Sequence, residues 1–179
     1  MDKNEEVSRG TLYYREAAGK LVRVMPGFFV DAQEAPTDEM LLQWMTSRQP
    51  ALTMNLISAL SYHGITTQIP AYLSVALPRG VRMPKVFSLP VKAWAVKREW
   101  ADIGVDEYRG AYGPYRVTSP ERTLVDCFRH RHKIGLDVFL EALAMARQHK
   151  KLDVWKLDDI ARRTSAARLI TPYLESTLS

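Results

Sequence analysis

The chain has 179 residues, of which 46% are hydrophobic and 25% charged, a composition typical of a soluble globular protein and not of a disordered one. At about 100–200 residues per domain, this length allows one full domain and a fragment of a second. The single cysteine excludes a disulfide framework or a thiolate zinc cluster and favours a reducing compartment. The formal net charge of +5 is compatible with an acidic partner such as nucleic acid.

The positive charge is concentrated towards the C-terminal end. Residues 129–179 contain 10 Lys and Arg against 6 Asp and Glu, a net charge of +4, whereas residues 1–128 carry 15 against 14, a net +1. The sequence shows neither a secretory leader nor an apolar stretch of about 20 residues. We therefore expect a cytoplasmic protein that makes no membrane contact.

The N-terminal segment is predicted to form a short helix followed by a hairpin. Residues 8–18 suit a helix, with Ser8 as N-cap and Gly19 just beyond the helix end. The β-prone runs 20–24 and 28–30 flank a Pro-Gly turn, which predicts two paired strands. The polar residues 31–36 indicate a linker.

The middle of the chain is predicted to change from helix to strand. Helices are expected over 37–47, with Thr37 as N-cap, and over 53–63, where Gly64 ends the helix. Short β-prone runs follow, separated by Pro and Gly, over 72–77, 85–89, 91–96 and 108–118, the last as one or two strands. Because the connections are too short for helical crossovers, we expect a largely antiparallel sheet.

The last third of the chain is predicted to be all helical. Ser119-Pro120 is a helix start signal, and Asp153 is a second N-cap. Apolar stripes predict further helices over 136–143 and 169–178, with Pro172 at a start or a kink. The order of helices, strands and helices predicts an α+β fold, with a short-stranded, largely antiparallel sheet flanked by helices.

The sequence contains none of the common catalytic or metal-binding motifs. There is no glycine-rich phosphate loop, no HExxH zinc motif, no cysteine pair and no GxSxG elbow. Cys127 lies inside a predicted helix, which favours a buried, inert thiol over a nucleophile. We predict no catalytic residue, no metal and no cofactor.

Two polar constellations remain in the middle of the chain. Arg122 and Asp126 stand at i, i+4 and can pair on one helix face, either as an internal ion pair or as a buried site where a partner docks. Thr118 and Glu121 could alternatively form a capping box. The proline-bounded loop 78–85 is either a basic turn or a grip for an acidic partner, through Arg79, Arg82 and Lys85.

Basic residues recur near the predicted helix ends of the last third. Helix dipoles favour cations at these positions without any further function. The alternative is one basic face that contacts phosphate groups, formed by Arg129, Arg131, Lys133, Arg147, Lys150, Lys151, Arg162 and Arg163.

Three segments together resemble the AbiEi family. They are Ser58-Ala59-Leu60 with His63-Gly64-Ile65, residues 75–80 (VALPRG) with Arg82 and Pro84, and residues 117–126 (VTSPERTLVD). AbiEi proteins are antitoxins and transcriptional regulators of abortive-infection (phage-resistance) toxin–antitoxin systems. The resemblance implies an N-terminal winged helix-turn-helix that binds operator DNA and a C-terminal α+β domain needed for antitoxicity and cooperative repression. It also implies a nucleotidyltransferase-like toxin as partner, commonly neutralised indirectly.

The resemblance matches residues 8–18 to the recognition helix and 20–30 to the wing. Residues 1–35 are then a partial winged helix-turn-helix plus linker, and 36–179 the antitoxin domain. Only seven residues precede Ser8, so the supporting helices are missing through truncation, a misassigned start, or loss in a natural homologue. In a competent helix, Arg9 and Arg15 contact bases or phosphates, and Lys20 and Arg23 contact the backbone.

Three functional hypotheses follow. The leading one is a non-enzymatic antitoxin that represses its own operon through operator DNA, which is compatible with a homo-oligomer on DNA. The alternative is a protein-binding module that docks the toxin through the 78–85 loop and the basic face, without DNA. The third is an enzyme that modifies the toxin through polar groups around Arg122 and Asp126.

Overall fold

Two sheets and the helices packed on them make up the fold, and the computed structural model describes residues 8–34, 36–87 and 89–178. The N-terminal elements are α1 (Arg9–Ala17), β1 (Leu21–Met25) and β2 (Phe28–Asp31). The central elements are α2 (Asp38–Arg48), β3 (Thr53–Met54), α3 (Leu56–His63), β4 (Leu73–Pro78), β5 (Val91–Val96), η1 (Arg98–Trp100), β6 (Val105–Gly110) and β7 (Gly113–Thr118). The C-terminal helices are α4 (Pro120–Arg129), α5 (Arg131–Ile134), α6 (Leu136–Gln148), α7 (Val154–Arg163) and α8 (Ala167–Leu178).

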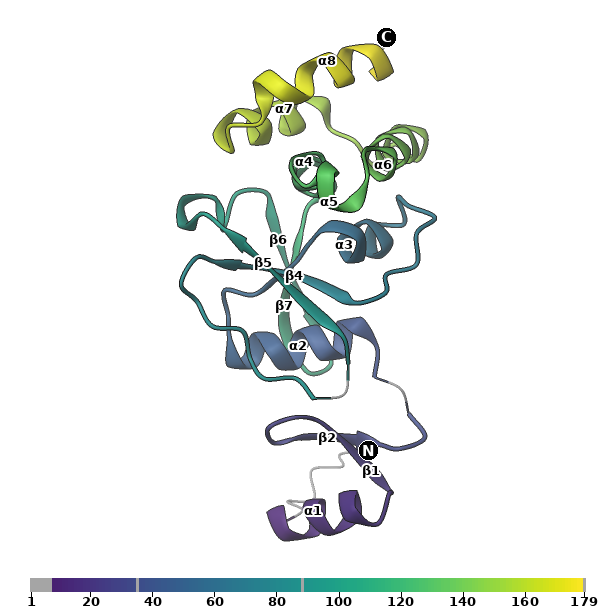
Figure 1. Ribbon diagram of the computed structural model, residues 1–179, viewed down its shortest axis with the longest axis vertical. Coiled ribbons are helices and arrows are strands. Elements are labelled where there is room, and N and C mark those ends of the chain that lie inside the picture. Colours follow the sequence, from purple (N-terminus) through teal and green to yellow (C-terminus); the bar gives the residue numbers. More distant parts are fainter. Residues whose placement is uncertain (1–7, 35, 88, 179) are drawn as a thin grey trace.

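The central sheet has the strand order β5-β4-β3-β7-β6. Helix α2 lies on one side of it, and α3 and α4 lie on the other (Figure 1). The pairs β3–β4, β6–β7 and β1–β2 are antiparallel, while β3–β7 and β4–β5 are parallel. The predicted α+β class with largely antiparallel strands is confirmed. The long loop between β4 and β5 crosses over without a helix, so connection length alone did not reveal the parallel pairs.

The apolar residues divide between two cores on the two sides of the central sheet. One core joins α3, α4, α6, α7 and α8 around Phe128 and Phe139. The other core joins α2 and the sheet to the hairpin residues Val24, Met25 and Val30. The β1–β2 hairpin therefore shares a core with α2, whereas α1 has no buried residue.

Four predicted N-caps are confirmed. The Oγ of Ser8 and of Ser119, and the Oγ1 of Thr37, each accept a hydrogen bond from a backbone N–H three residues on. The Asp153 carboxylate accepts from the N–H groups of the two residues after Val154, at 3.0 and 3.1 Å. Gly64 ends α3 in the left-handed conformation, as expected. Pro172 lies inside α8.

Two element predictions were wrong. Thr53 and Met54 form the short strand β3 between β4 and β7, so the helix predicted from residue 53 begins only at Leu56. Residues 85–87 and 89 form no strand, so the strand predicted over 85–89 is wrong for the part of that segment that the structure describes; Ser88 lies outside the described residues. Prolines bound that segment, and the Phe87 N–H donates to the Val24 carbonyl at 2.9 Å, which ties the loop to the hairpin.

In the described residues 8–34, 36–87 and 89–178, no helix is long and apolar enough to cross a membrane.

Candidate functional site

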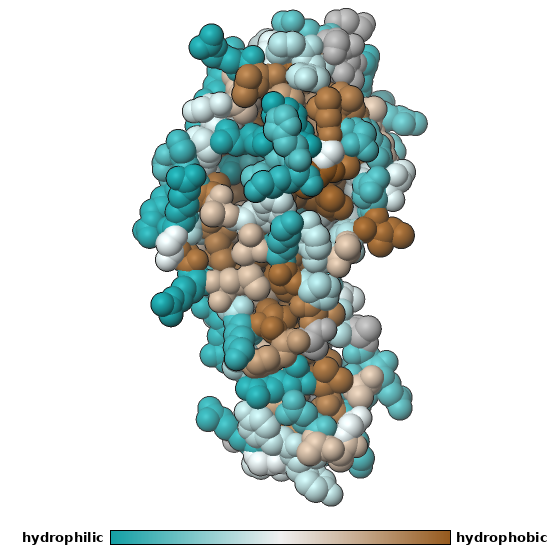
Figure 2. Space-filling model, viewed as in Figure 1, coloured by the Kyte–Doolittle hydropathy of each residue, from teal (hydrophilic) through white to brown (hydrophobic). Residues whose placement is uncertain are grey.

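Helix α1 and the β1–β2 hairpin form one end of the molecule (Figure 1). That end presents mainly hydrophilic and intermediate side chains (Figure 2). Tyr13 of α1 packs edge-on against Phe29 of β2, with ring centroids 5.6 Å apart. The side chains of Arg9, Arg15 and Lys20 are exposed and Arg23 is half-buried. The arginines at 9 and 15 and the lysine at 20 are thus available to a partner.

A cleft of about 500 Å³ lies between α1 and the hairpin, and we call it the arginine cleft. It is lined by Arg9, Arg23 and Arg48 together with apolar or small residues, and no acidic residue lines it among those described. Three guanidinium groups around one concavity favour an anionic ligand, because each offers several fixed donors to a phosphate or carboxylate. Arg15 and Lys20 lie outside the cleft.

Arg48 was missed from the sequence. It is the last residue of α2, and its Nη2 donates to the Pro26 carbonyl at the hairpin turn, at 3.3 Å. Gly27 has a φ of +83°, which favours glycine at this turn, and an added Cβ there would lie 3.3 Å from that Nη2. The only sequence signal was a cation directly after the helix predicted over 37–47.

The Arg23 guanidinium is held between aromatic rings. It lies 4.8 Å from the Phe87 centroid and 5.4 Å from that of Tyr13. Its Nε is buried and has no hydrogen-bond partner among the residues that the structure describes. Such a donor is costly to leave unpaired, which is consistent with an anion entering from the cleft.

The basic residues predicted in the last third divide into those that bind backbone carbonyls and those that are exposed. Arg129 donates to the Thr164 carbonyl at the end of α7, and Arg131 donates to Phe128 O at 3.0 Å. Lys151 instead binds the His63 carbonyl at the end of α3, at 2.6 Å. The remaining cations lie on exposed parts of α5, α6, α7 and the turn after α6, as Lys133, Arg147, Lys150, Arg162 and Arg163. The last two pair with Asp158 and Asp159, which reduces their net charge.

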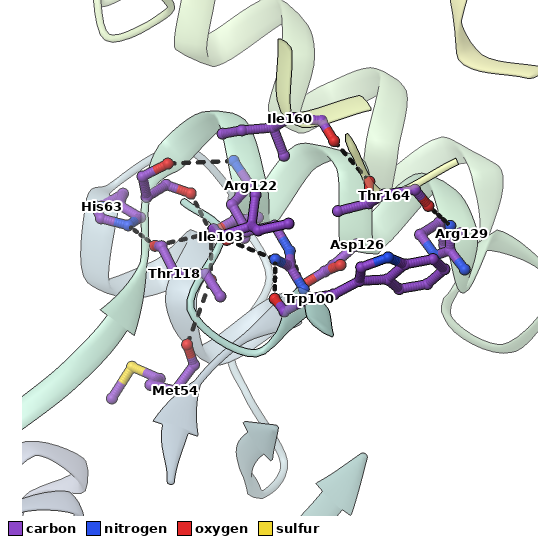
Figure 3. A network of polar contacts seen from close by, with 12 residues as sticks. Met54, His63, Trp100, Ile103, Thr118, Arg122, Asp126, Arg129, Ile160 and Thr164 are labelled. Carbon is purple, nitrogen blue, oxygen red and sulfur yellow. Dashed lines mark hydrogen bonds and ion pairs between the residues drawn. The ribbon is translucent and has the colours of Figure 1, made fainter. Parts of the chain in front are cut away.

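Arg122 and Asp126 form a buried ion pair, which confirms the first of the two readings of their spacing. The Nε–Oδ2 distance is 3.0 Å, and the residues are 2% and 7% exposed. Arg122 Nη1 also donates to the carbonyls of Trp100 and Ile103, at 2.8 and 2.5 Å (Figure 3). Arg122 thus fastens α4 to the segment after η1, and its guanidinium does not reach the surface.

The alternative capping box between Thr118 and Glu121 was wrong. Thr118 Oγ1 hydrogen-bonds Thr123 at 2.7 Å, and Ser119 caps the helix instead. Glu121 accepts from the Ser119 hydroxyl and from the Asp153 N–H, and it pairs with Lys156 of α7. The motif 118–126 therefore joins β7, α4 and α7 through a polar network.

The basic loop after β4 is exposed at Arg79, Arg82 and Lys85. Its course is fixed by Arg98, whose Nε donates to the Arg79 carbonyl at 3.2 Å. None of the three cations forms an ion pair within the described part of the chain. Within the same residues, no group of three or more His, Cys, Asp and Glu side chains is placed to hold a metal ion.

Burial lowers the pKa of His63 and of His130. The His63 Nε2 lies 2.7 Å from the Thr118 carbonyl oxygen, so the ring donates there. Because the folded pKa lies below the unfolded value of about 6.5, the unfolded chain binds more protons as the pH falls through that value. We expect the free energy of unfolding contributed by these rings to decrease between about pH 7.5 and pH 5.5.

Urea unfolding at several pH values tests this expectation. The double variant His63→Gln, His130→Gln is expected to show a flatter decline on acidification than the wild type. His132→Gln, at an exposed position, is the matched control for the substitution itself. A double variant with the wild-type slope would contradict the assignment.

Comparison with known proteins identifies the family. The model of the AbiEi antitoxin C-terminal domain matches residues 52–172, well over half of the chain. The chain belongs to the AbiEi antitoxin family. The matched region carries the motif 118–126 and the buried Arg122 pair. Helix α1 and the hairpin lie outside the match.

A solved structure gives the same fold for this AbiEi chain. The RV2827C protein of Mycobacterium tuberculosis superposes with a TM-score of 0.68 at 16% identity, over 94% of this chain and 64% of that one. At this identity the likeness establishes the fold alone. The chain spans less than two thirds of the length of that protein. A search of curated proteins gives no match.

Proposed function

We propose that this AbiEi antitoxin represses its own operon by binding operator DNA and neutralises a nucleotidyltransferase-like toxin without catalysing a reaction. The arginine cleft carries the DNA-binding part of the proposal. A recognition helix followed by a two-stranded wing matches the order of α1, β1 and β2, and recognition helices place their N-terminal residues near base edges.

Each cation has a distinct role in this proposal. Arg9 and Arg15 of α1 contact bases or phosphates, and Lys20 contacts the backbone beside them. Arg23 and Arg48 hold a phosphate in the arginine cleft from the hairpin side. Exposed cations of the last third, such as Lys133 and Lys150, add further phosphate contacts, which suits a homo-oligomer spread along the DNA.

Binding to the DNA upstream of the gene tests the proposal. Fluorescence anisotropy with that fragment is expected to give an affinity at least 10³-fold tighter than with a scrambled fragment of equal length. The logarithm of the binding constant should fall linearly with the logarithm of salt concentration. Equal affinities for the two fragments would rule out operator recognition by this chain.

A second candidate is direct docking of the toxin through Arg79, Arg82 and Lys85. The observation that favours it is the exposure of three cations on a proline-bounded loop, with no acidic residue paired to them in the described regions. Replacing all three by glutamate is expected to abolish co-purification with the toxin. Full protection against the toxin by this charge-reversed variant would count against direct docking.

A further inference from the structure

A second cavity, of about 190 Å³, lies between the β4–β5 edge of the central sheet and α4. Its lining includes Asn55, Trp94 and Asp126, which come from three separate segments of the chain. Pockets for drug-sized ligands measure about 300–1,000 Å³. The cavity is therefore too small to enclose a whole nucleotide and suits a small metabolite.

Two buried polar atoms of the lining make no hydrogen bond within the described residues. They are Asn55 Oδ1 and Trp94 Nε1, on side chains that are 3% and 7% exposed. Asn55 stands at the N-cap of α3, yet its side chain makes no capping bond. Buried polar groups are almost always paired in folded proteins, so an acceptor and a donor left together in one cavity indicate a ligand that supplies both.

The charges around the cavity are also of both signs. The Asp126 carboxylate lines it while one oxygen, Oδ2, is held by Arg122. Arg79 and Lys97 supply cations at the opening, although Lys97 lies 3.8 Å from Glu99. Arg129 also lines the cavity and stacks on the Trp100 ring at 4.3 Å. A simple anion would meet the Asp126 carboxylate, and a simple cation would meet the arginines.

We propose that this cavity binds a small zwitterion of the free amino-acid class. The ligand's ammonium group donates to Asn55 Oδ1 and the Asp126 carboxylate. Its carboxylate accepts from Trp94 Nε1 and pairs with Arg79 and Lys97. The lining residues lie on or next to β3 and β5, which both pair with β4. Ligand binding would therefore stabilise the central sheet, which supports both cores.

Thermal unfolding of the full chain with free L-amino acids tests the proposal. At millimolar concentration, at least one amino acid is expected to raise the unfolding midpoint by mass action, and calorimetric titration should then give a saturable 1:1 isotherm. Acetate and orthophosphate test whether an anion alone binds, and ammonium tests whether a cation alone binds. None of the three should bind. The proposal is overturned if no amino acid binds, or if acetate or orthophosphate binds as tightly as the best one.

Variants locate the site. Trp94→Phe keeps the ring but removes the N–H, and it is expected to weaken binding about 10-fold or more, the value of a hydrogen bond to a charged group. Trp155→Phe, on the exposed start of α7, should bind as the wild type does. If Trp94→Phe fails to fold, Arg79→Met gives the test at an exposed position, with Arg82→Met as control. Unchanged binding in Arg79→Met would place the ligand elsewhere and refute the proposal.

Discussion

Replacing Arg122 by methionine is expected to destabilise the protein by about 3–5 kcal/mol. Methionine keeps much of the side-chain volume but removes the guanidinium group. Asp126 then becomes a buried charge without its partner, and the carbonyls of Trp100 and Ile103 each lose a donor. The measurement is the urea unfolding curve at neutral pH, analysed for midpoint and slope.

A second ion pair with the same spacing provides the control. Arg162 and Asp158 are also i, i+4 and lie 2.8 Å apart, but the Arg162 side chain is 73% exposed. Arg162→Met should cost at most about 1 kcal/mol. Arg122→Lys should fall between the two variants, because lysine keeps the charge but lacks the planar fork. If Arg122→Met proves as mild as Arg162→Met, the pair does not anchor α4.

Removing the three cations of the arginine cleft is expected to reduce operator binding strongly. Each phosphate contact that is lost should flatten the salt dependence by about one unit, so the triple variant Arg9→Met, Arg23→Met, Arg48→Met should lose about three. We expect the affinity for the upstream DNA to fall towards that for scrambled DNA. Anisotropy titrations at several salt concentrations provide both numbers.

The matched control removes three exposed arginines elsewhere, at positions 82, 109 and 168. It changes the net charge equally and should leave most of the salt dependence intact. Because Arg23 is half-buried, circular dichroism must show that the triple variant is folded. Arg9→Met alone, at an exposed position, should still flatten the dependence by about one unit. Identical behaviour of the two triple variants would assign DNA binding to overall charge and not to the cleft.

Structural features that depend on residues close together in the sequence could be predicted. The caps at Ser8, Thr37, Ser119 and Asp153 depend on residues two or three positions apart, and the Arg122–Asp126 pair depends on one helical turn. The family could also be predicted from local sequence, because the three segments that carry the resemblance all lie within the matched residues 52–172.

Features that depend on distant segments were not predictable. Strand β3 is only two residues long, and it exists because two neighbouring strands bind it. Arg48 reaches the hairpin turn across 22 positions of sequence, so its place in the arginine cleft could not be read from spacing. The cavity lined by Asn55, Trp94 and Asp126 could not be predicted either, because these residues are far apart in the sequence.

We propose that this chain protects a cell from a toxin, and growth rescue tests this antitoxin role most directly. The neighbouring gene, tested as the candidate toxin gene, and the gene for this chain are placed under separate inducible promoters. We expect growth arrest when the toxin is induced alone and restored growth when this chain is induced with it. Persistent arrest while the folded chain accumulates would contradict the antitoxin assignment for this protein.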